Sequence, residues 1–241
     1  LLLILNDMAP FDTAEDFDNV GLIIGSKKEK VQSITVCLDC TLNIIDEAIS
    51  NNSNLIISHH PIIFGGINNI IIDNFNGKII EKLIKNDINL ITMHTNLDKA
   101  QNGIADSLAQ SIASNNEIVN ISNYSRFIKF ENPVDNSNLI NEVNTVLNTK
   151  TRIFGNTNTK IKSLVCSPGA GGDSVHEAIE LCADALITGE IKHHQIVEAC
   201  SSGVVILDVG HFSSEFIGMK NFANILKNKL EKIPVYISKA I

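Results

Sequence analysis

The chain has 241 residues, of which 44% are hydrophobic and 19% are charged, and its formal net charge is −8. This length allows one large domain or two small ones, each with a core of its own. The negative charge argues against a nucleic-acid-binding protein, because such proteins neutralise phosphates with clustered lysine and arginine.

The leucine-rich start of the chain and its cysteines bear on location. Residues 1–5 form a run that is too short to span a membrane, and they lack the basic flank of a signal peptide. The five cysteines are an odd number, which favours reduced thiols over a disulfide framework. We therefore expect a cytoplasmic protein that does not associate with membranes.

The first half of the chain predicts strands that alternate with helices. Strands are expected at 22–24, 31–38, 54–58 and 88–93, and helices at 42–49, 77–86 and 103–113. Thr41 is a suitable N-cap for the first of these helices. This alternation is typical of an α/β fold with a mostly parallel sheet flanked by helices.

The composition changes near residue 121, where we place a domain boundary. Residues 122–138 and 148–160 are rich in Asn, Ser and Thr. The later part predicts helices at 137–147, 174–183 and 191–200 and strands at 161–166, 185–188 and 204–208, followed by a helix from the 210–215 segment to about 230 and a strand at 235–237. The second part therefore also reads as α/β.

Three predicted strands end in residues that could bind a metal. His59 and His60 follow the strand at 54–58, Asp98 follows the strand at 88–93, and His211 and Glu215 stand four residues apart after the strand at 204–208. The carboxyl ends of strands are where open α/β sheets bind ligands. Taken singly, each has a structural alternative. His59 and His60 could be ordinary loop histidines, and Asp98 could be a capping or turn residue. His211 and Glu215 could lie on a solvated helix face.

Together these five residues favour a metal centre. Imidazole and carboxylate suit zinc, iron, manganese or nickel. Five ligands are too many for one closed tetrahedral site and suit two ions with open positions, where a bound water would reach a pKa of about 7 and become hydroxide. Asp98 could bridge the ions, and His94 could be an outer hydrogen-bond donor or a substrate-binding group.

Five short motifs follow one another along the chain in an order that is typical of one protein family. They are Asp18–Gly21, Ser58–Pro61, His94–Asp98, Thr188–Lys192 and Gly210–Glu215. Over essentially the whole chain this order resembles the GTP cyclohydrolase I type 2 homologue family, the Nif-three-like dinuclear-metal proteins, in its short two-domain form.

The resemblance implies two α/β domains with mixed or mostly parallel sheets, the first completed by the C-terminal segment. The domains would comprise residues 1–120 plus 204–241, which bind metal, and residues 121–203. It also implies a ring-shaped homohexamer and two divalent ions per chain, with the same five ligands. The chain departs from the family pattern at Phe17, Glu190 and His193, where we expect Trp, Asp and Tyr. None of these is a ligand.

Two functional hypotheses follow. The first is a metal-dependent hydrolase or cyclohydrolase that acts on a small molecule, such as a nucleotide or phosphoester, through metal-bound hydroxide. Its catalytic residues stay open, with His94, Glu190 and His194 as candidates. The alternative is a non-catalytic, hexameric metal-binding scaffold.

Two weaker signals have structural alternatives. The glycine-rich segment 167–172 could hold a phosphate, but Ser174 and Glu177 have capping-box spacing, which favours a tight structural turn. Cys37 and Cys40 form a Cys-x-x-Cys motif before a helix, as in a redox dithiol, a role that would require a near-neutral thiol pKa.

Overall fold

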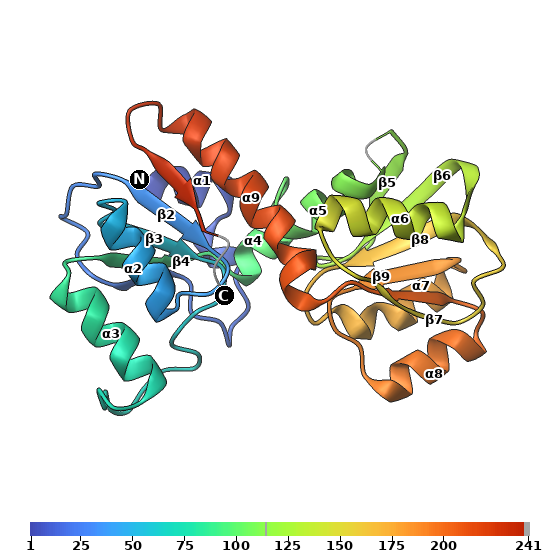
Figure 1. The fold of residues 1–241 in the computed structure, drawn as a ribbon, viewed down its shortest axis with the longest axis horizontal. Helices are drawn as coiled ribbons and strands as arrows, with labels where there is room; N and C mark the ends of the chain where they lie inside the picture. Colours follow the sequence, from blue (N-terminus) through green and yellow to red (C-terminus); the bar gives the residue numbers. More distant parts are fainter. Residues whose placement is uncertain (114, 239–241) are drawn as a thin grey trace. The chain divides into compact units, whose positions relative to one another are not determined.

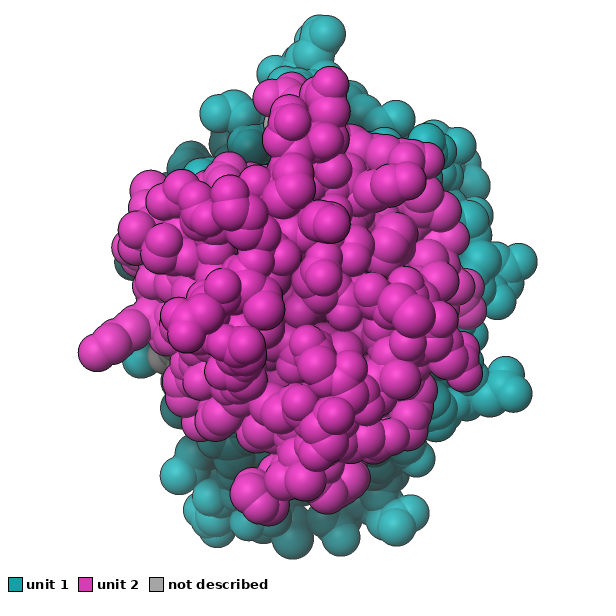
Figure 2. Space-filling model, turned by 90° about the vertical axis from the view of Figure 1, so that its right-hand side faces the viewer, with its two compact units in different colours: residues 1–103, 219–241 teal, residues 104–218 magenta. Residues whose placement is uncertain are grey.

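The computed structural model describes residues 1–113 and 115–238. The chain divides into two compact units, which are coloured separately in Figure 2. Unit 1 comprises residues 1–103 and 219–241, and unit 2 comprises residues 104–218. Each unit is built around its own sheet.

The sheet of unit 1 has five strands in the order β1-β4-β3-β2-β11. They are β1 (Gly21–Ile24), β2 (Ile34–Cys37), β3 (Leu55–Ser58), β4 (Asn89–Thr92) and β11 (Val235–Ile237). Strands β2, β3, β4 and β11 are parallel, and β1 pairs with β4 in the antiparallel sense. The three inner strands are buried along their whole length, as expected for parallel strands covered on both faces.

Unit 1 contains the helices α1 (Leu2–Met8), α2 (Leu42–Ser50), α3 (Phe75–Lys85) and α4 (Thr95–Lys99), and the 3₁₀ turn η1 (Phe11–Thr13). The apolar faces of α2 and α3 pack with Ile56 and Leu90 of the sheet in one core. The Thr41 side chain accepts a hydrogen bond from the Ile44 N–H at the start of α2, so the predicted N-cap is confirmed.

The sheet of unit 2 has six strands in the order β5-β6-β8-β9-β10-β7. They are β5 (Glu117–Asn120), β6 (Arg126–Asp135), β7 (Arg152–Phe154), β8 (Lys160–Ser167), β9 (Ala185–Thr188) and β10 (Val205–Asp208). Strands β8, β9 and β10 are parallel, whereas β6 and β7 run antiparallel to their neighbours.

Helices cover both faces of this second sheet (Figure 1). Alternate residues of β8 point to opposite faces, so that Leu164 packs with α5 (Ile104–Ala113) and α6 (Asn136–Leu147), and Val165 packs with α7 (Val175–Glu180) and α8 (His193–Ser201). The 3₁₀ turn η2 (Gly171–Ser174) precedes α7, and α9 (His211–Lys229) begins in unit 2 and ends in unit 1. The predicted α/β class, with mixed or mostly parallel sheets flanked by helices, is confirmed.

The C-terminal segment completes the first sheet, as predicted, because β11 pairs with β2. The bounds of the compact units differ from the expected domains, 1–120 plus 204–241 and 121–203. Strand β10 lies in unit 2 because it pairs with β9 and β7, and α5 lies there because it packs on β6 and β8. The division into folding domains stays a prediction.

Strands β5, β6 and β7 were not predicted from the sequence. Strand β6 is largely exposed, so its polar residues conceal a strand, and its register shifts between Lys129 and Val134, on either side of Pro133. Strands β5 and β7 lie at the two edges of the sheet. Within 1–113 and 115–238, no helix combines the length and apolarity needed to cross a membrane.

Candidate metal centre

The carboxyl ends of three neighbouring strands deliver polar side chains to one edge of the unit 1 sheet. Asp39 follows β2, His59 and His60 follow β3 directly, and His94 follows β4. Because β2, β3 and β4 are adjacent and parallel, these side chains leave the sheet at the same edge.

Three of these residues form the first candidate ligand group. One ring nitrogen from each of His59, His60 and His94 lies within 4.8 Å of the other two. Asp98, in α4, places Oδ1 3.4 Å from His59 Nε2. Unit 1 therefore brings together His59, His60 and Asp98, as expected, and adds His94, whose role the sequence left open.

The orientation of the first two imidazoles is set by their Nδ1 atoms. His59 Nδ1 donates to the Met93 carbonyl oxygen at 2.8 Å, and His60 Nδ1 donates to Asp39 Oδ1 at 2.8 Å. Carbonyl and carboxylate oxygens only accept, so Nδ1 carries the hydrogen, and in a neutral ring the lone pair is then on Nε2. Both rings are thus in the tautomer that binds a metal through Nε2.

His94 is held by a buried carboxylate. Its Nδ1 donates to Asp18 Oδ1 at 2.8 Å, while the Thr95 backbone N–H and hydroxyl both donate to Asp18 Oδ2, at 3.0 and 2.5 Å. Burial opposes ionisation of Asp18, but these hydrogen bonds and the electrostatic attraction to His94 outweigh it and hold the Asp18 pKa well below its ordinary value. Asp18 is therefore a carboxylate at neutral pH.

The second candidate ligand group lies in unit 2, where α9 begins after β10. His211 Nε2 is 3.0 Å from Glu215 Oε2, one helical turn later, so the predicted sharing of one helix face is confirmed. His211 Nδ1 donates to Oε1 of Glu190, which follows β9, at 2.9 Å. Glu190 therefore orients His211 in the same way that Asp39 orients His60.

Two glycines let the start of α9 pack closely against its neighbours. A Cβ atom on Gly169 would lie 2.0 Å from Glu215 Oε1, and one on Gly189 would lie 2.5 Å from Ser214 Oγ and 2.8 Å from His211 Cα. The Gly169 N–H also donates to Ser214 Oγ at 2.9 Å. The glycine-rich segment thus has a structural role in positioning Glu215, while its role as a phosphate site stays a prediction.

The predicted capping box at Ser174 is wrong. The Ser174 side chain makes no capping hydrogen bond, because its hydroxyl pairs with Ser167 Oγ at 3.0 Å and Ser125 Oγ at 2.7 Å. His194 is exposed in the first turn of α8 and is in neither of the ligand groups described above. Its catalytic candidacy remains untested.

The Cys-x-x-Cys motif belongs to the core of unit 1. Cys37 and Cys40 are both buried free thiols. Burial raises the pKa of Cys40 to about 12 and raises that of Cys37 well above its ordinary value, with the charge of Asp39 adding to both. Neither thiol has the near-neutral pKa that the dithiol hypothesis requires.

The roles of Asp39 and Asp18 as hydrogen-bond acceptors for histidines were not predicted from the sequence. An aspartate after a strand is usually a turn residue, so Asp39 alone carried no signal. The role of Asp39 could have been predicted only from the strand order. Because β2 is the parallel neighbour of β3, a carboxylate just beyond β2 lies beside imidazoles just beyond β3.

These residues fit a divalent ion. All four imidazoles, His59, His60, His94 and His211, have Nδ1 hydrogen-bonded to an oxygen that can only accept. Histidines that bind metals in proteins nearly always donate their other ring N–H in this manner. Carboxylates stand beside the Nε2 atoms of His59 and His211, which completes a nitrogen and oxygen donor set.

Comparison with known proteins identifies one family. The model of the Duf34/NIF3 (NGG1p interacting factor 3) family matches residues 1–241. A relative from Clostridium acetobutylicum named GTP cyclohydrolase 1 type 2 homolog is 34% identical, over 96% of this chain and 90% of its own.

Two solved structures share the fold. A hypothetical protein from Staphylococcus aureus superposes with a TM-score of 0.89 at 31% identity, covering 99% of this chain and 95% of its own. Reduced HcgD from Methanocaldococcus jannaschii has a TM-score of 0.87 at 25% identity, covering 99% and 96%. The chain therefore belongs to the Duf34/NIF3 family.

Proposed function

We propose that this chain binds two divalent metal ions through His59, His60, Asp98, His211 and Glu215 and is a hydrolase of a small nucleotide or phosphoester. The observation that carries the proposal is the shared Nδ1 arrangement. Each imidazole is fixed through Nδ1 by an oxygen acceptor, as is usual for histidines that bind a metal through Nε2. Zinc, iron, manganese and nickel all suit this donor set.

The donor set also favours an anionic substrate. Divalent ions with open coordination positions bind the anionic oxygens of a phosphate group. When bound, such ions act as Lewis acids and lower the pKa of a bound water to about 7. This affinity for phosphate oxygens supports a nucleotide or phosphoester over a neutral substrate.

Within this proposal His94 and Glu190 have different roles. His94 donates to Asp18 through Nδ1, so Nε2 of a neutral ring can accept a proton or serve as a further ligand, and the ring belongs to the same group as His59 and His60. Glu190 is engaged with His211 Nδ1 and acts by orienting that ring. We therefore assign proton transfer to His94 rather than to Glu190.

Turnover tests the catalytic proposal. Protein loaded with zinc, manganese or iron is assayed with nucleoside phosphates and with simple phosphoesters, in the wild type and in Asp98→Ala. We expect turnover that falls by more than about 100-fold in Asp98→Ala, because loss of a metal ligand removes the whole metal contribution. Asp73→Ala removes an exposed loop carboxylate and is the matched control, with turnover expected to stay at the wild-type level.

The non-catalytic scaffold predicts a different pattern. A wild-type protein that holds two ions and turns over none of these substrates would contradict the hydrolase proposal and support the scaffold. Turnover that persists in Asp98→Ala would contradict the role of Asp98.

Homohexameric assembly and a cytoplasmic location are also proposed. The hexamer rests on the family resemblance and is tested by native mass spectrometry, where a monomer would contradict it. The cytoplasmic location is supported by the five free cysteines, since oxidising compartments favour disulfides. Fractionation of the source cells tests it.

A further inference from the structure

Two exposed aromatic rings lie together in unit 1. Phe17 is 60% exposed and Phe64 is 57% exposed, and their ring centroids are 5.9 Å apart with an interplanar angle of 43°. Single exposed apolar side chains are ordinary on protein surfaces, whereas exposed apolar groups in contact with one another often mark binding sites. A pair of exposed rings in contact therefore marks a candidate recognition surface.

Both rings are carried by segments that are fixed in place. The Asn19 side-chain amide donates to the Ile63 carbonyl oxygen at 2.9 Å, which ties the segment of Phe17 to the segment of Phe64. Asp18, next to Phe17, is anchored by His94 and Thr95. The backbone segments that carry the two rings are thus held together, which reduces the entropy lost on binding.

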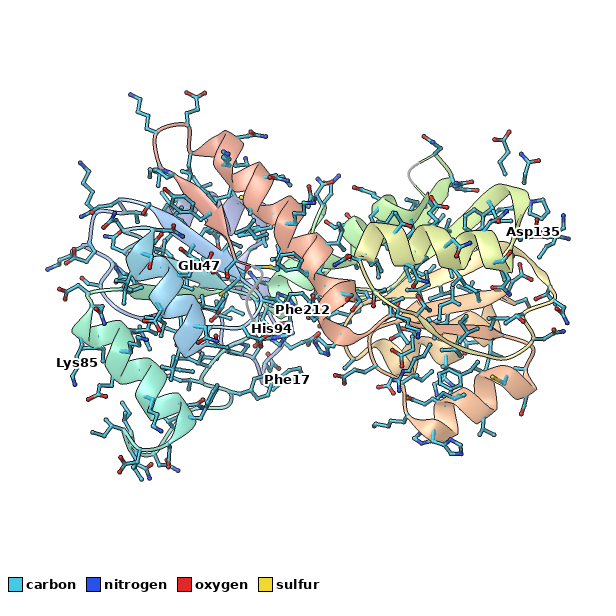
Figure 3. The ribbon with its side chains drawn as sticks, in the orientation of Figure 1. Phe17, Glu47, Lys85, His94, Asp135 and Phe212 are labelled. Atoms are coloured by element: carbon cyan, nitrogen blue, oxygen red, sulfur yellow. The ribbon has the colours of Figure 1, made fainter. Side chains whose placement is uncertain are left out.

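The aromatic pair adjoins the first candidate ligand group. The Phe64 ring centroid is 6.3 Å from that of His94, with the ring planes nearly perpendicular at 74°. Figure 3 shows Phe17 and His94 in the same region of unit 1. A substrate whose reacting group lies at the imidazoles would therefore place its neighbouring part against these rings.

We propose that Phe17 and Phe64 form an aromatic platform on which a planar heteroaromatic ring of the substrate stacks, as a nucleobase would. This inference rests on the proposed function and narrows its substrate class from phosphoesters in general to base-bearing phosphates. A cationic centre beside an aromatic surface matches a ligand with an anionic group at one end and a planar ring at the other. A sugar phosphate offers only the first of these.

Tryptophan reporters test the platform directly. The chain contains no tryptophan, so Phe64→Trp introduces a single indole that a stacked base quenches. Ile84→Trp is the matched control, because Ile84 is 60% exposed in α3 of the same unit. Its neighbour Lys85 lies well away from Phe17 and His94 in Figure 3.

Each reporter is titrated with adenosine 5′-monophosphate and with ribose 5-phosphate. We expect saturable quenching only for Phe64→Trp with the nucleotide. Equal quenching of both reporters would overturn the proposal, because it does not depend on the position of the indole. Equal quenching of Phe64→Trp by ribose 5-phosphate and by the nucleotide would also overturn it, because ribose 5-phosphate has no base that could stack.

Calorimetry with the full chain gives the second readout. In the wild type we expect the nucleotide to bind about tenfold more tightly than ribose 5-phosphate, a ratio typical of one base–aromatic stack. Phe64→Ala is expected to abolish this ratio and Phe64→Trp to preserve it. A ratio that Phe64→Ala leaves intact would overturn the platform.

Two further measurements on the same samples distinguish failure of the aromatic platform from failure of the proposed metal centre. Metal content reports on the proposed function: a metal-loaded wild type that binds both phosphates equally would overturn the platform and leave the metal centre standing. Native mass spectrometry reports on assembly. A loss of oligomer mass in Phe64→Ala without any change in the binding ratio would assign the rings to contact with a second copy of the chain and overturn the proposal.

Discussion

The two groups of candidate ligands are positioned by different means. In unit 1 the ring of His94 is oriented by Asp18, whose side chain is fully buried. In unit 2 the ring of His211 is oriented by Glu190, whose side chain is 61% exposed. Ion pairs with exposed partners contribute little in water, so unit 2 needs another source of precision.

In unit 2 the ligands His211 and Glu215 are positioned by close backbone packing. Gly169 and Gly189 allow the first turn of α9 to approach its neighbours more closely than any residue with a Cβ atom would permit. The comparison shows that unit 1 fixes the imidazole of His94 by a hydrogen bond to a buried acceptor, whereas unit 2 fixes its ligands by the shape of the backbone. Substitutions can separate these two modes.

The largest effect is expected for Gly169→Ala. The new Cβ atom would lie 2.0 Å from Glu215 Oε1, at the flexible end of that side chain, so the carboxylate is displaced. Metal affinity should fall by about 100-fold, as for strong perturbations of ligand geometry. Metal titration by calorimetry measures the change.

Gly203→Ala is the control for backbone strain. Gly203 has φ +85°, so alanine is strained there as it is at Gly169 with φ +60°, but no atom lies within 4 Å of the added Cβ. Both variants should lose about 1–2 kcal/mol of stability, and only Gly169→Ala should lose metal affinity. Equal affinities in the two variants would show that close packing does not position Glu215.

Asp18→Asn is expected to give the next largest effect, on stability. Hydrogen bonds to the Asp18 carboxylate lower its pKa, so the wild type should exceed the variant by about 2 kcal/mol in free energy of unfolding at pH 7. A depressed pKa gives stability that is present above the unfolded value of about 4 and is lost as the pH falls towards the folded value. Urea unfolding at pH 7 and pH 3 measures both.

The exposed neighbour of Asp18 provides the comparison. Asp16→Asn removes an exposed carboxylate from the same segment and should leave the free energy of unfolding close to that of the wild type. If the deficit of Asp18→Asn did not shrink in acid, the Asp18 carboxylate would not be the source of the stability.

A smaller contrast is expected between Asp39→Asn and Glu190→Gln. Both variants keep the shape of an acceptor to a histidine Nδ1 and remove its charge. Asp39→Asn should lower metal affinity by about tenfold, and Glu190→Gln by less than about threefold, because the more exposed pair is weakened by water. The reverse order in metal titrations would contradict the contrast between the two units.

The smallest effect is expected at the Cys-x-x-Cys motif. Since Cys37 and Cys40 are buried and their thiol pKa values are raised, a thiol reagent at pH 8 should modify exposed Cys182 first and should modify these two only after unfolding. Mass spectrometry of the labelled peptides identifies the order. Rapid labelling of Cys40 in the folded protein would revive the dithiol hypothesis.

The sequence was informative where a pattern is both local and apolar. The run Leu55–Ile57 identified β3, and the polar residues directly after it identified His59 and His60. The apolar spacing after Thr41 likewise identified α2 and its cap. In these cases one short segment contains both the element and its boundary signal.

The sequence was not informative where a role depends on a neighbour in space. Asp39 acquires its role from the pairing of β2 with β3, and Ser174 is diverted from its cap by hydroxyls 7 and 49 residues away. Strand β6 is largely exposed and polar, so the composition that suggested a boundary conceals a ten-residue strand. Such roles depend on the order of the strands in the sheet, which cannot be predicted from local patterns in a single sequence.

Metal content per chain tests the central claim most directly. Elemental analysis of the untagged wild type, of His59→Ala from unit 1 and of Glu215→Ala from unit 2 compares the two ligand groups. We predict about two divalent ions per chain in the wild type, as in two-metal hydrolases, and a loss of bound metal in both variants. A wild type that stays empty after incubation with zinc, manganese and iron would contradict the account.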